Sequence, residues 1–227
     1  MKTKRMTAQP VPIQRRMIPW LGGAVWVGGC LVFSYLMMSY DFTPGRLGPR
    51  RTWWPTETTL SRRQGAPTVV AFLHPRCVCT RATVKQLVRT VQAHPGAELL
   101  AVVFVPTPMT DTQAWEQGEY VKTIRADVPQ AHIVYDRGGV EAQRFGAWTS
   151  GTVLVYDEQG QERFRGGITD RRGGERDNLG LQRLAGTLAG SPSVAEAAPT
   201  PVFGCPLVAS TNERGSHDDA ADRSATR

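Results

Sequence analysis

Short apolar runs alternate with segments of helical periodicity along the middle of the chain. Thr68–Leu73 and Leu99–Val105 are continuous apolar runs rich in β-branched residues, which is typical of strands that are buried on both faces. Between them, residues 79–93 repeat apolar positions at i, i+3, i+4 and i+7 and stop before Pro95, so they predict an amphipathic helix. The apolar positions of that helix are Val84, Leu87, Val88 and Val91.

The pattern continues further along the chain and adds helices, a strand and a hairpin. Residues 113–125 predict a helix that turns Trp115, Val121 and Ile124 inward, and His132–Tyr135 predicts a short strand. The remaining predicted elements are helical turns at Val140–Phe145, hairpin strands at Thr152–Tyr156 and Glu162–Phe164, and a last helix through Leu181, Leu184, Ala185 and Leu188 with Asp177 or Asn178 as N-cap. The order β-α-β-α-β-α-β-β-α predicts a mixed central sheet covered by helices, which is an α/β sandwich.

An apolar segment of a different kind lies near the N-terminus. Ile18–Met38 contains no charged residue, and its 21 residues would span roughly 31 Å as a helix, which matches a bilayer core. Residues 1–17 hold five basic residues and no acidic one, which predicts that this tail stays in the cytoplasm. We therefore expect a single-pass transmembrane helix over residues 18–38 of the cell (inner) membrane, in contact with lipid. The body of the protein would lie in the periplasm or an equivalent extracytoplasmic compartment.

Two other interpretations of this segment stay open. Val27–Cys30 resembles a lipobox, which would make the protein a lipoprotein, and a cleaved signal peptide would also begin with basic residues and an apolar run. However, the apolar run continues past Cys30 to Met38, and no A-x-A cleavage site is present. An uncleaved anchor is therefore the favoured interpretation.

The net charge of +7 looks at first like a property of the whole protein. Five of the 27 basic residues lie in the N-terminal tail, so residues 41–227 hold 22 basic and 20 acidic side chains. This near balance argues against a nucleic-acid-binding domain. The sequence also contains no P-loop, zinc-protease or hydrolase motif. A local cluster of Arg171, Arg172 and Arg176 is offset by neighbouring acidic residues, and we expect it to be a solvated loop.

Proline, glycine and small polar residues divide the rest of the chain. We expect residues 39–59 to form a linker, 60–190 to form the folded domain, and 191–207 to form a C-terminal extension that contains Cys205. Residues 208–227 lack aromatic residues and are rich in small polar ones, so we expect a disordered tail there.

Two cysteines mark the junction between the first predicted strand and the first predicted helix, in the Cys-Val-Cys sequence of residues 77–79. A thiolate at a helix N-terminus meets backbone N–H groups and the positive end of the helix dipole, and both lower its pKa. Arg76 and Arg81 flank the pair and act in the same direction, and His74 is within reach of the loop. This pattern indicates a nucleophilic thiol. A disulfide across so short a spacing would be strained and therefore oxidising.

Strand, cysteine pair, helix, βαβ unit and a terminal hairpin with a closing helix together resemble the thioredoxin superfamily. Four stretches within residues 53–207 resemble a group of membrane-anchored bacterial thioredoxin-like proteins, the RedB-like group, which typically has HPxCPCxRA at the cysteine pair. These stretches are AFLHPRCVCTRAT, TSGTVLVYDEQG, GGITDRRGGERDN and TPVFGCPL. The resemblance implies a thioredoxin-like α/β sandwich with catalysis at Cys77 and Cys79.

Several positions depart from ordinary thioredoxins. The pair is Cys-x-Cys and not Cys-x-x-Cys, Val78 stands where the RedB-like group has proline, and Ala71 stands where thioredoxin has a buried acid. Ser150-Gly151 replaces the cis-proline, which in thioredoxins presents substrate backbone and keeps metals off the cysteines. These departures weaken the ordinary disulfide-exchange interpretation and leave room for a metal.

The resemblance implies that Cys77 is an exposed attacking thiol and that Cys79 is the resolving thiol. Cys205 has three open interpretations, because it follows the closing helix after a proline-rich stretch that could fold back. It is an incidental buried cysteine, a third redox residue or a metal ligand.

The favoured functional hypothesis is a thiol–disulfide oxidoreductase that needs no cofactor and acts on protein thiols or disulfides outside the cytoplasm. An alternative is a copper-binding or metal-assembly factor, in which Cys77 and Cys79, together with His74 or Cys205, bind Cu(I). A further alternative is a thioredoxin-fold binding module without turnover. A peroxidase is disfavoured, because Val70–Arg76 lacks the Pro-x-x-x-Thr/Ser-x-x-Cys pattern.

Overall fold

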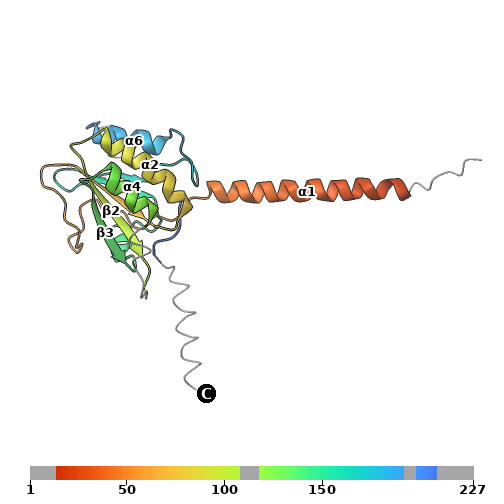
Figure 1. Ribbon diagram of the computed structural model, residues 1–227, viewed down its shortest axis with the longest axis horizontal. Coiled ribbons are helices and arrows are strands. Elements are labelled where there is room, and N and C mark those ends of the chain that lie inside the picture. Colours follow the sequence, from red (N-terminus) through yellow and green to blue (C-terminus); the bar gives the residue numbers. More distant parts are fainter. Residues whose placement is uncertain (1–13, 108–117, 192–197, 209–227) are drawn as a thin grey trace, which may run out of the picture. The chain divides into compact units, whose positions relative to one another are not determined.

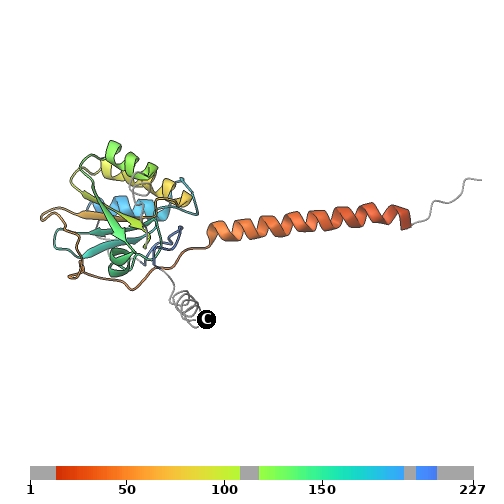
Figure 2. The same ribbon diagram turned by 60° about the horizontal axis from the view of Figure 1, so that its bottom comes forward.

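The computed structural model describes three stretches of the chain, which are residues 14–107, 118–191 and 198–208 (Figure 1). The chain divides into two units, with the boundary between Asp41 and Phe42. The first unit contains one long helix. The second contains a β-sheet with the helices that cover it, and Figure 2 shows the same ribbon from another side.

The long helix is α1 (Gln14–Phe42). Its stretch Trp20–Phe42 is 23 residues long with a mean hydropathy of 1.7, so it is long and apolar enough to cross a membrane. The segment predicted to span, residues 18–38, lies within this helix, which is consistent with a single-pass anchor.

The second unit is built on a five-stranded mixed sheet with the strand order β3-β2-β1-β4-β5. The strands are β1 (Thr68–Leu73), β2 (Glu98–Val105), β3 (His132–Arg137), β4 (Thr152–Tyr156) and β5 (Glu162–Gly166). β1, β2 and β3 run parallel, whereas β4 is antiparallel to both β1 and β5. β1 is therefore the central strand, and all six of its residues are buried, as a continuous apolar run predicts.

Helices cover both faces of this sheet. They are α2 (Val78–Gln92), α4 (Glu119–Asp127), α5 (Val140–Arg144) and α6 (Leu179–Leu188). Successive residues of β1 point to opposite faces, so Val69 and Ala71 pack with α2, α4 and α6, whereas Val70 and Phe72 pack with α5. The ribbon views show α2, α4 and α6 gathered on the same side (Figures 1 and 2). The predicted α/β sandwich is thus present.

Most predicted elements agree with the structure to within two residues, and residues 113–117 of the helix predicted over 113–125 lie outside the described residues. The described helix α4 begins at Glu119, after Gly118 as N-cap, and continues to Asp127. Val121 and Ile124 are buried as predicted, whereas Trp115 lies outside the described residues.

The sequence predicts Asp177 or Asn178 as the N-cap of the last helix, and the structure shows which of the two it is. Asn178 is the N-cap of α6: its Oδ1 atom accepts a hydrogen bond of 3.1 Å from the backbone N–H of Leu181. Its amide group also donates a hydrogen bond of 2.9 Å to the carbonyl oxygen of Ile168. Both ends of the side chain therefore fix the start of this helix.

Within the predicted linker over residues 39–59, residues 42–59 belong to the sheet unit and pack against its core. The backbone N–H of Gly45 donates to the carbonyl of Val202, at 2.7 Å. Further along, the ring of Trp54 lies edge-on to the rings of Phe145 and Tyr156, with centroids 5.1 and 5.0 Å apart. This segment therefore contributes to the apolar core on the α5 side of the sheet.

A buried ion cluster joins the same segment to the hairpin. Glu162 is fully buried and pairs with Arg50 at 2.7 Å and with Arg165 at 3.3 Å. Arg165 also donates to the carbonyl oxygens of Phe145 and Gly146, at 3.0 and 2.7 Å. The charges are thus compensated by partners on three segments, which is what a buried ion pair requires.

Candidate thiol site

The loop that carries the cysteine pair lies at the C-terminal end of the central strand. Because β4 runs antiparallel to β1, its first residue Thr152 pairs with Phe72 near the end of β1. The turn before β4 is therefore beside the loop before α2. Two hydrogen bonds of 2.8 Å join them, from the His74 N–H to the Ser150 hydroxyl and from the Gly151 N–H to the Phe72 carbonyl.

A third piece of chain reaches the same place, and we call residues 200–207 the C-terminal segment. The backbone N–H of Ser150 donates to the carbonyl of Cys205, and the N–H of Leu207 donates to the carbonyl of Trp148, both at 2.8 Å. These bonds follow the pattern of a short antiparallel pair. The structure therefore brings Cys205 to the cysteine pair.

Gly204 and Arg172 hold the C-terminal segment in this position. A Cβ atom on Gly204 would clash with the carbonyl oxygen of Ser150, so the close approach requires glycine. The guanidinium of Arg172 donates a hydrogen bond of 3.0 Å to the carbonyl of Gly204. Arg172 also donates to the sulfur of Cys79, so it connects the segment to the first turn of α2.

Cys77 is the N-cap of α2, and only 1% of its surface is exposed. Burial raises the pKa of its thiol, but hydrogen bonds from Thr80 and Cys205 to the sulfur outweigh burial, so the pKa of Cys77 is lowered from its ordinary value. The expectation of an exposed attacking thiol is wrong in this respect. The third segment brings Cys205 against the sulfur, which a strand–loop–helix pattern does not predict.

A chain of two hydroxyl groups leads to this sulfur. The Ser150 hydroxyl accepts the His74 N–H and shares a hydrogen bond of 2.8 Å with the Thr80 hydroxyl, and both hydroxyl groups are buried. Thr80 uses its only hydroxyl proton to donate to the sulfur of Cys77. When the Thr80 proton points to the sulfur, Ser150 can supply the proton of the bond between the two hydroxyl groups, and this arrangement stabilises a thiolate at Cys77.

The pKa values of the other two thiols of the site, Cys79 and Cys205, are raised. Burial is the main cause that raises the pKa of Cys79, and the negative charge of Cys77 adds to it, whereas Arg172 opposes it. Burial, then a hydrogen bond to Cys77 and the charge of Cys77, raise the pKa of Cys205 to about 12. The site thus favours ionisation of Cys77 and disfavours ionisation of Cys79 and Cys205.

The supporting residues predicted from the sequence occupy different positions. His74 is half-buried and its ring stacks on Phe104 with centroids 5.4 Å apart, while its Nδ1 atom accepts the backbone N–H of Arg76 at 3.2 Å. Burial lowers the pKa of His74, and the charge of Arg76 adds to this. Arg81 is exposed and pairs with Glu119 at 2.7 Å.

Gly151 has a left-handed backbone, with φ +88°, and it lies directly after Ser150. A Cβ atom at this position would lie 3.1 Å from the hydroxyl oxygen of Thr83 on α2. A side chain there would therefore be strained by its backbone conformation and would crowd the helix. Glycine lets the turn before β4 approach the first turns of α2.

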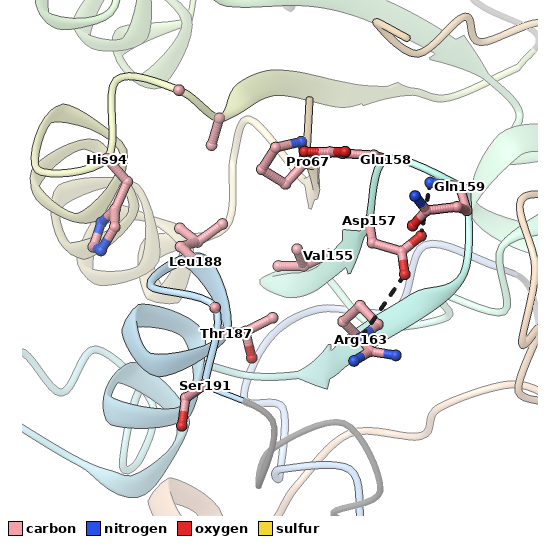
Figure 3. A pocket seen from close by; sticks show the side chains of 13 residues that line it. Pro67, His94, Val155, Asp157, Glu158, Gln159, Arg163, Thr187, Leu188 and Ser191 are labelled. Carbon is pink, nitrogen blue, oxygen red and sulfur yellow. Dashed lines mark hydrogen bonds and ion pairs between the residues drawn. The ribbon is translucent and has the colours of Figure 1, made fainter. Parts of the chain in front are cut away.

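The described residues contain no group of three or more His, Cys, Asp or Glu side chains arranged to hold a metal ion. A cavity of about 510 Å³ does exist, but it lies elsewhere (Figure 3). It is lined by Pro67 before β1, His94 after α2 and Asp157 in the hairpin turn. Since these residues lie beyond the N-terminal end of β1, the cavity is at the opposite end of the strand from the thiols.

No protein-family model matches the chain, and no curated protein matches it. Among solved structures, an uncharacterized conserved protein from Geobacillus kaustophilus matches with a TM-score of 0.50 and 17% identity, over 75% of this chain and 94% of that one. A hypothetical protein from Sinorhizobium meliloti also has a TM-score of 0.50 and 17% identity, over 74% and 96%. A thioredoxin-like protein in its oxidized form reaches 0.44 and 18%, over 66% and 95%.

The strand order, the parallel and antiparallel pairings and the cysteine N-cap on α2 decide the fold class. The chain has a thioredoxin-like fold. At 17% identity, the two solved structures with a TM-score of 0.50 show a shared fold and not an activity.

Sequence analysis did not assign a role in the thiol site to Thr80, Ser150 or Arg172. Thr80 and Ser150 look like ordinary helix and turn residues, and only the pairing of β4 with β1 joins them. Arg172, which we expected in a solvated loop, instead lies between Cys79 and Gly204, and that expectation is wrong for this residue. The arginine cluster in the sequence does not predict that Arg172 contacts the sulfur of Cys79, because the position of Arg172 depends on how the C-terminal segment folds.

Proposed function

We propose that the protein is a membrane-anchored thiol–disulfide oxidoreductase of the extracytoplasmic space, with Cys77 as its nucleophile. The observation that supports this proposal best is the buried sulfur at the N-cap of α2, which accepts hydrogen bonds from Thr80 and Cys205. A thiolate, and not a thiol, attacks disulfides. Membership of the RedB-like group, which the sequence resembles, is part of the same proposal.

The chemistry needs only the thiols of the chain and a partner disulfide. The thiolate of Cys77 attacks one sulfur of the partner disulfide, forms a mixed disulfide with it and releases the other sulfur as a thiolate, which takes up a proton. A second thiol of the chain then attacks the sulfur of Cys77 and releases the partner as a dithiol. Two electrons pass from the chain to the partner, and the reverse sequence would oxidise the partner.

The anchor part of the proposal rests on α1. Its apolar side chains are exposed, among them Trp26 at 72% and Phe33 at 63%, and such a surface is favourable in lipid and costly in water. The basic residues before it favour a cytoplasmic N-terminus. The thiol site would then lie in the compartment where disulfides persist.

The activity is tested on the full chain extracted in detergent. We expect it to catalyse the reduction of a model protein disulfide by a small dithiol, and we expect Cys77→Ser to reduce this rate to background. Cys30→Ser is the matched control, because Cys30 lies in α1 outside the site, and it should keep the native rate. A native rate equal to that of Cys77→Ser would contradict the proposal and favour a binding module.

The topology is tested separately, in cells whose outer membrane has been permeabilised. An added protease should degrade the thioredoxin-like domain and leave an N-terminal tag intact. The membrane fraction should retain the full-length chain after alkaline washing. A mature form that begins at Cys30, or a chain released from the membrane, would contradict the uncleaved anchor.

A further inference from the structure

The C-terminal segment presents a cysteine to the thiolate of the site as a bound peptide would. Residues Trp148 and Ser150 bind its backbone through two hydrogen bonds of 2.8 Å, and an isolated bridge joins Thr149 to Pro206. This places Cys205 so that both its backbone N–H and its thiol donate hydrogen bonds to the sulfur of Cys77. The two cysteines are 128 positions apart in the sequence, so their contact depends entirely on the fold.

Cys79 is less suited to form a disulfide with Cys77, although its thiol also contacts that sulfur. Cys79 lies inside the first turn of α2, where the helix fixes its backbone. A disulfide between the two would close a small, strained ring. Cys205 belongs instead to a separate segment, whose backbone is not fixed by the helix.

We propose that the disulfide formed during turnover joins Cys77 to Cys205, so that Cys205 is the resolving cysteine and Cys79 is not. This inference rests on the proposed function. After Cys77 has formed a mixed disulfide with the partner, the sulfur of Cys205 attacks the sulfur of Cys77 and the partner leaves as a thiolate. The thiol proton of Cys205 passes to that thiolate. The chain is oxidised by two electrons, the partner is reduced by two, and a small dithiol restores the chain.

The acidity of Cys205 sets the order of these steps. Burial raises its pKa most, and the hydrogen bond to Cys77 and the charge of Cys77 raise it further. The mixed disulfide removes the negative charge from Cys77, so these two contributions disappear when the second attack is needed. While Cys77 is ionised, Cys205 therefore stays protonated and does not compete with Cys77 for the partner.

Tryptic digestion separates the possible disulfides without any variant. Arg76 and Arg81 flank both cysteines of the pair, so residues 77–81 form one peptide, and Cys205 lies in the peptide of residues 184–214. Full chain oxidised with diamide in detergent should give these two peptides joined by a disulfide. The joined peptides should persist in Cys79→Ala and be lost in Cys77→Ala. A disulfide within the 77–81 peptide, or joined peptides that need Cys79, would overturn the inference.

Trapping with glutathione disulfide tests the resolving step and separates the two proposals. Cys205→Ala should remain glutathionylated at Cys77, whereas Cys79→Ala should still release glutathione from Cys77. If Cys205→Ala releases glutathione at the native rate, the inference fails while the proposed function stands. If the native chain reacts no faster than Cys77→Ala, the proposed function itself fails.

Discussion

Two hydroxyl groups control the charge of a single sulfur in this protein. Thr80 donates to Cys77, and Ser150 completes the hydrogen bonding of Thr80 at 2.8 Å. A hydrogen bond to a charged group is worth about 1.5–3 kcal/mol, which outweighs an ordinary neutral bond. Single residues that never touch a substrate can therefore decide whether the thiol is reactive at neutral pH.

Thr80→Val keeps the shape of the side chain and removes the donor, so we expect the pKa of Cys77 to rise. Because that pKa is lowered in the native chain, the thiolate there forms at lower pH than in an ordinary cysteine. In the variant it should form at higher pH, and exchange at neutral pH should slow on the order of tenfold. The ultraviolet absorbance of the thiolate, followed against pH, measures the shift.

The control for this change is Thr123→Val, which removes a hydroxyl from the exposed surface of α4. Its titration and its exchange rate should match those of the native chain. Equal titration curves for Thr80→Val and the native chain would show that the hydroxyl does not stabilise the thiolate.

At the scale of elements, the C-terminal segment behaves as an additional strand beside the turn before β4. It has no apolar periodicity of its own, and its position depends on backbone pairing with Trp148 and Ser150 and on the close approach of Gly204. The ends of the segment are anchored, with Thr200 hydrogen-bonded to Gly167 and Leu207 buried in the core, so local opening would be confined to the residues around Gly204. Opening would uncover Cys77, so access to the thiolate and the stability of this segment are linked.

Gly204→Ala should displace the C-terminal segment, because the added Cβ would clash with the Ser150 carbonyl. We expect iodoacetamide to alkylate Cys77 several-fold faster in this variant, as measured on the tryptic peptide of residues 77–81. Gly96→Ala is the matched control, since a Cβ there meets no atom within 4 Å, and it should leave the rate unchanged. Equal rates for both variants would show that the segment does not control access.

At the scale of the whole molecule, two segments outside the α/β core, one before β1 and one after α6, pack onto the sheet unit. The segment before β1 is held by the buried cluster of Glu162, Arg50 and Arg165, and the segment after α6 is held at the thiol site. Removing one partner of a buried ion pair costs about 3–5 kcal/mol, because a charge stays behind without compensation. Substitutions in this cluster therefore test the stability of the fold without changing the thiol site.

Arg165→Met should lower the free energy of unfolding by about 3–5 kcal/mol, because Glu162 loses one of its two cationic partners and four backbone carbonyls lose a donor. Arg163→Met, whose guanidinium lies 3.9 Å from Asp157 on a more exposed surface, should cost less than about 1 kcal/mol. Chemical denaturation followed by circular dichroism measures both. Similar losses in the two variants would contradict a special role for the buried cluster.

The elements of the sheet unit follow from local pattern. The apolar run of β1, the spacing on α2 and the hairpin turn before β5 identify those elements, because burial of one face or both imposes a period on the sequence. Gly118 is the N-cap of α4 although it lies inside the helix predicted over 113–125, because a glycine N-cap carries little signal in the sequence.

Local patterns in the sequence predict the strands, the helices, the apolar N-terminal segment and the cysteine pair at the start of α2. The burial of Cys77, the link from Ser150 through Thr80 to its sulfur, and the presence of Arg172 and Cys205 in the site appear only once the chain has folded. The physical reason is sequence separation. Periodicity reports which face of an element is buried, whereas contacts between residues 77, 150 and 205 depend on strand order and backbone pairing, which leave no periodic signal.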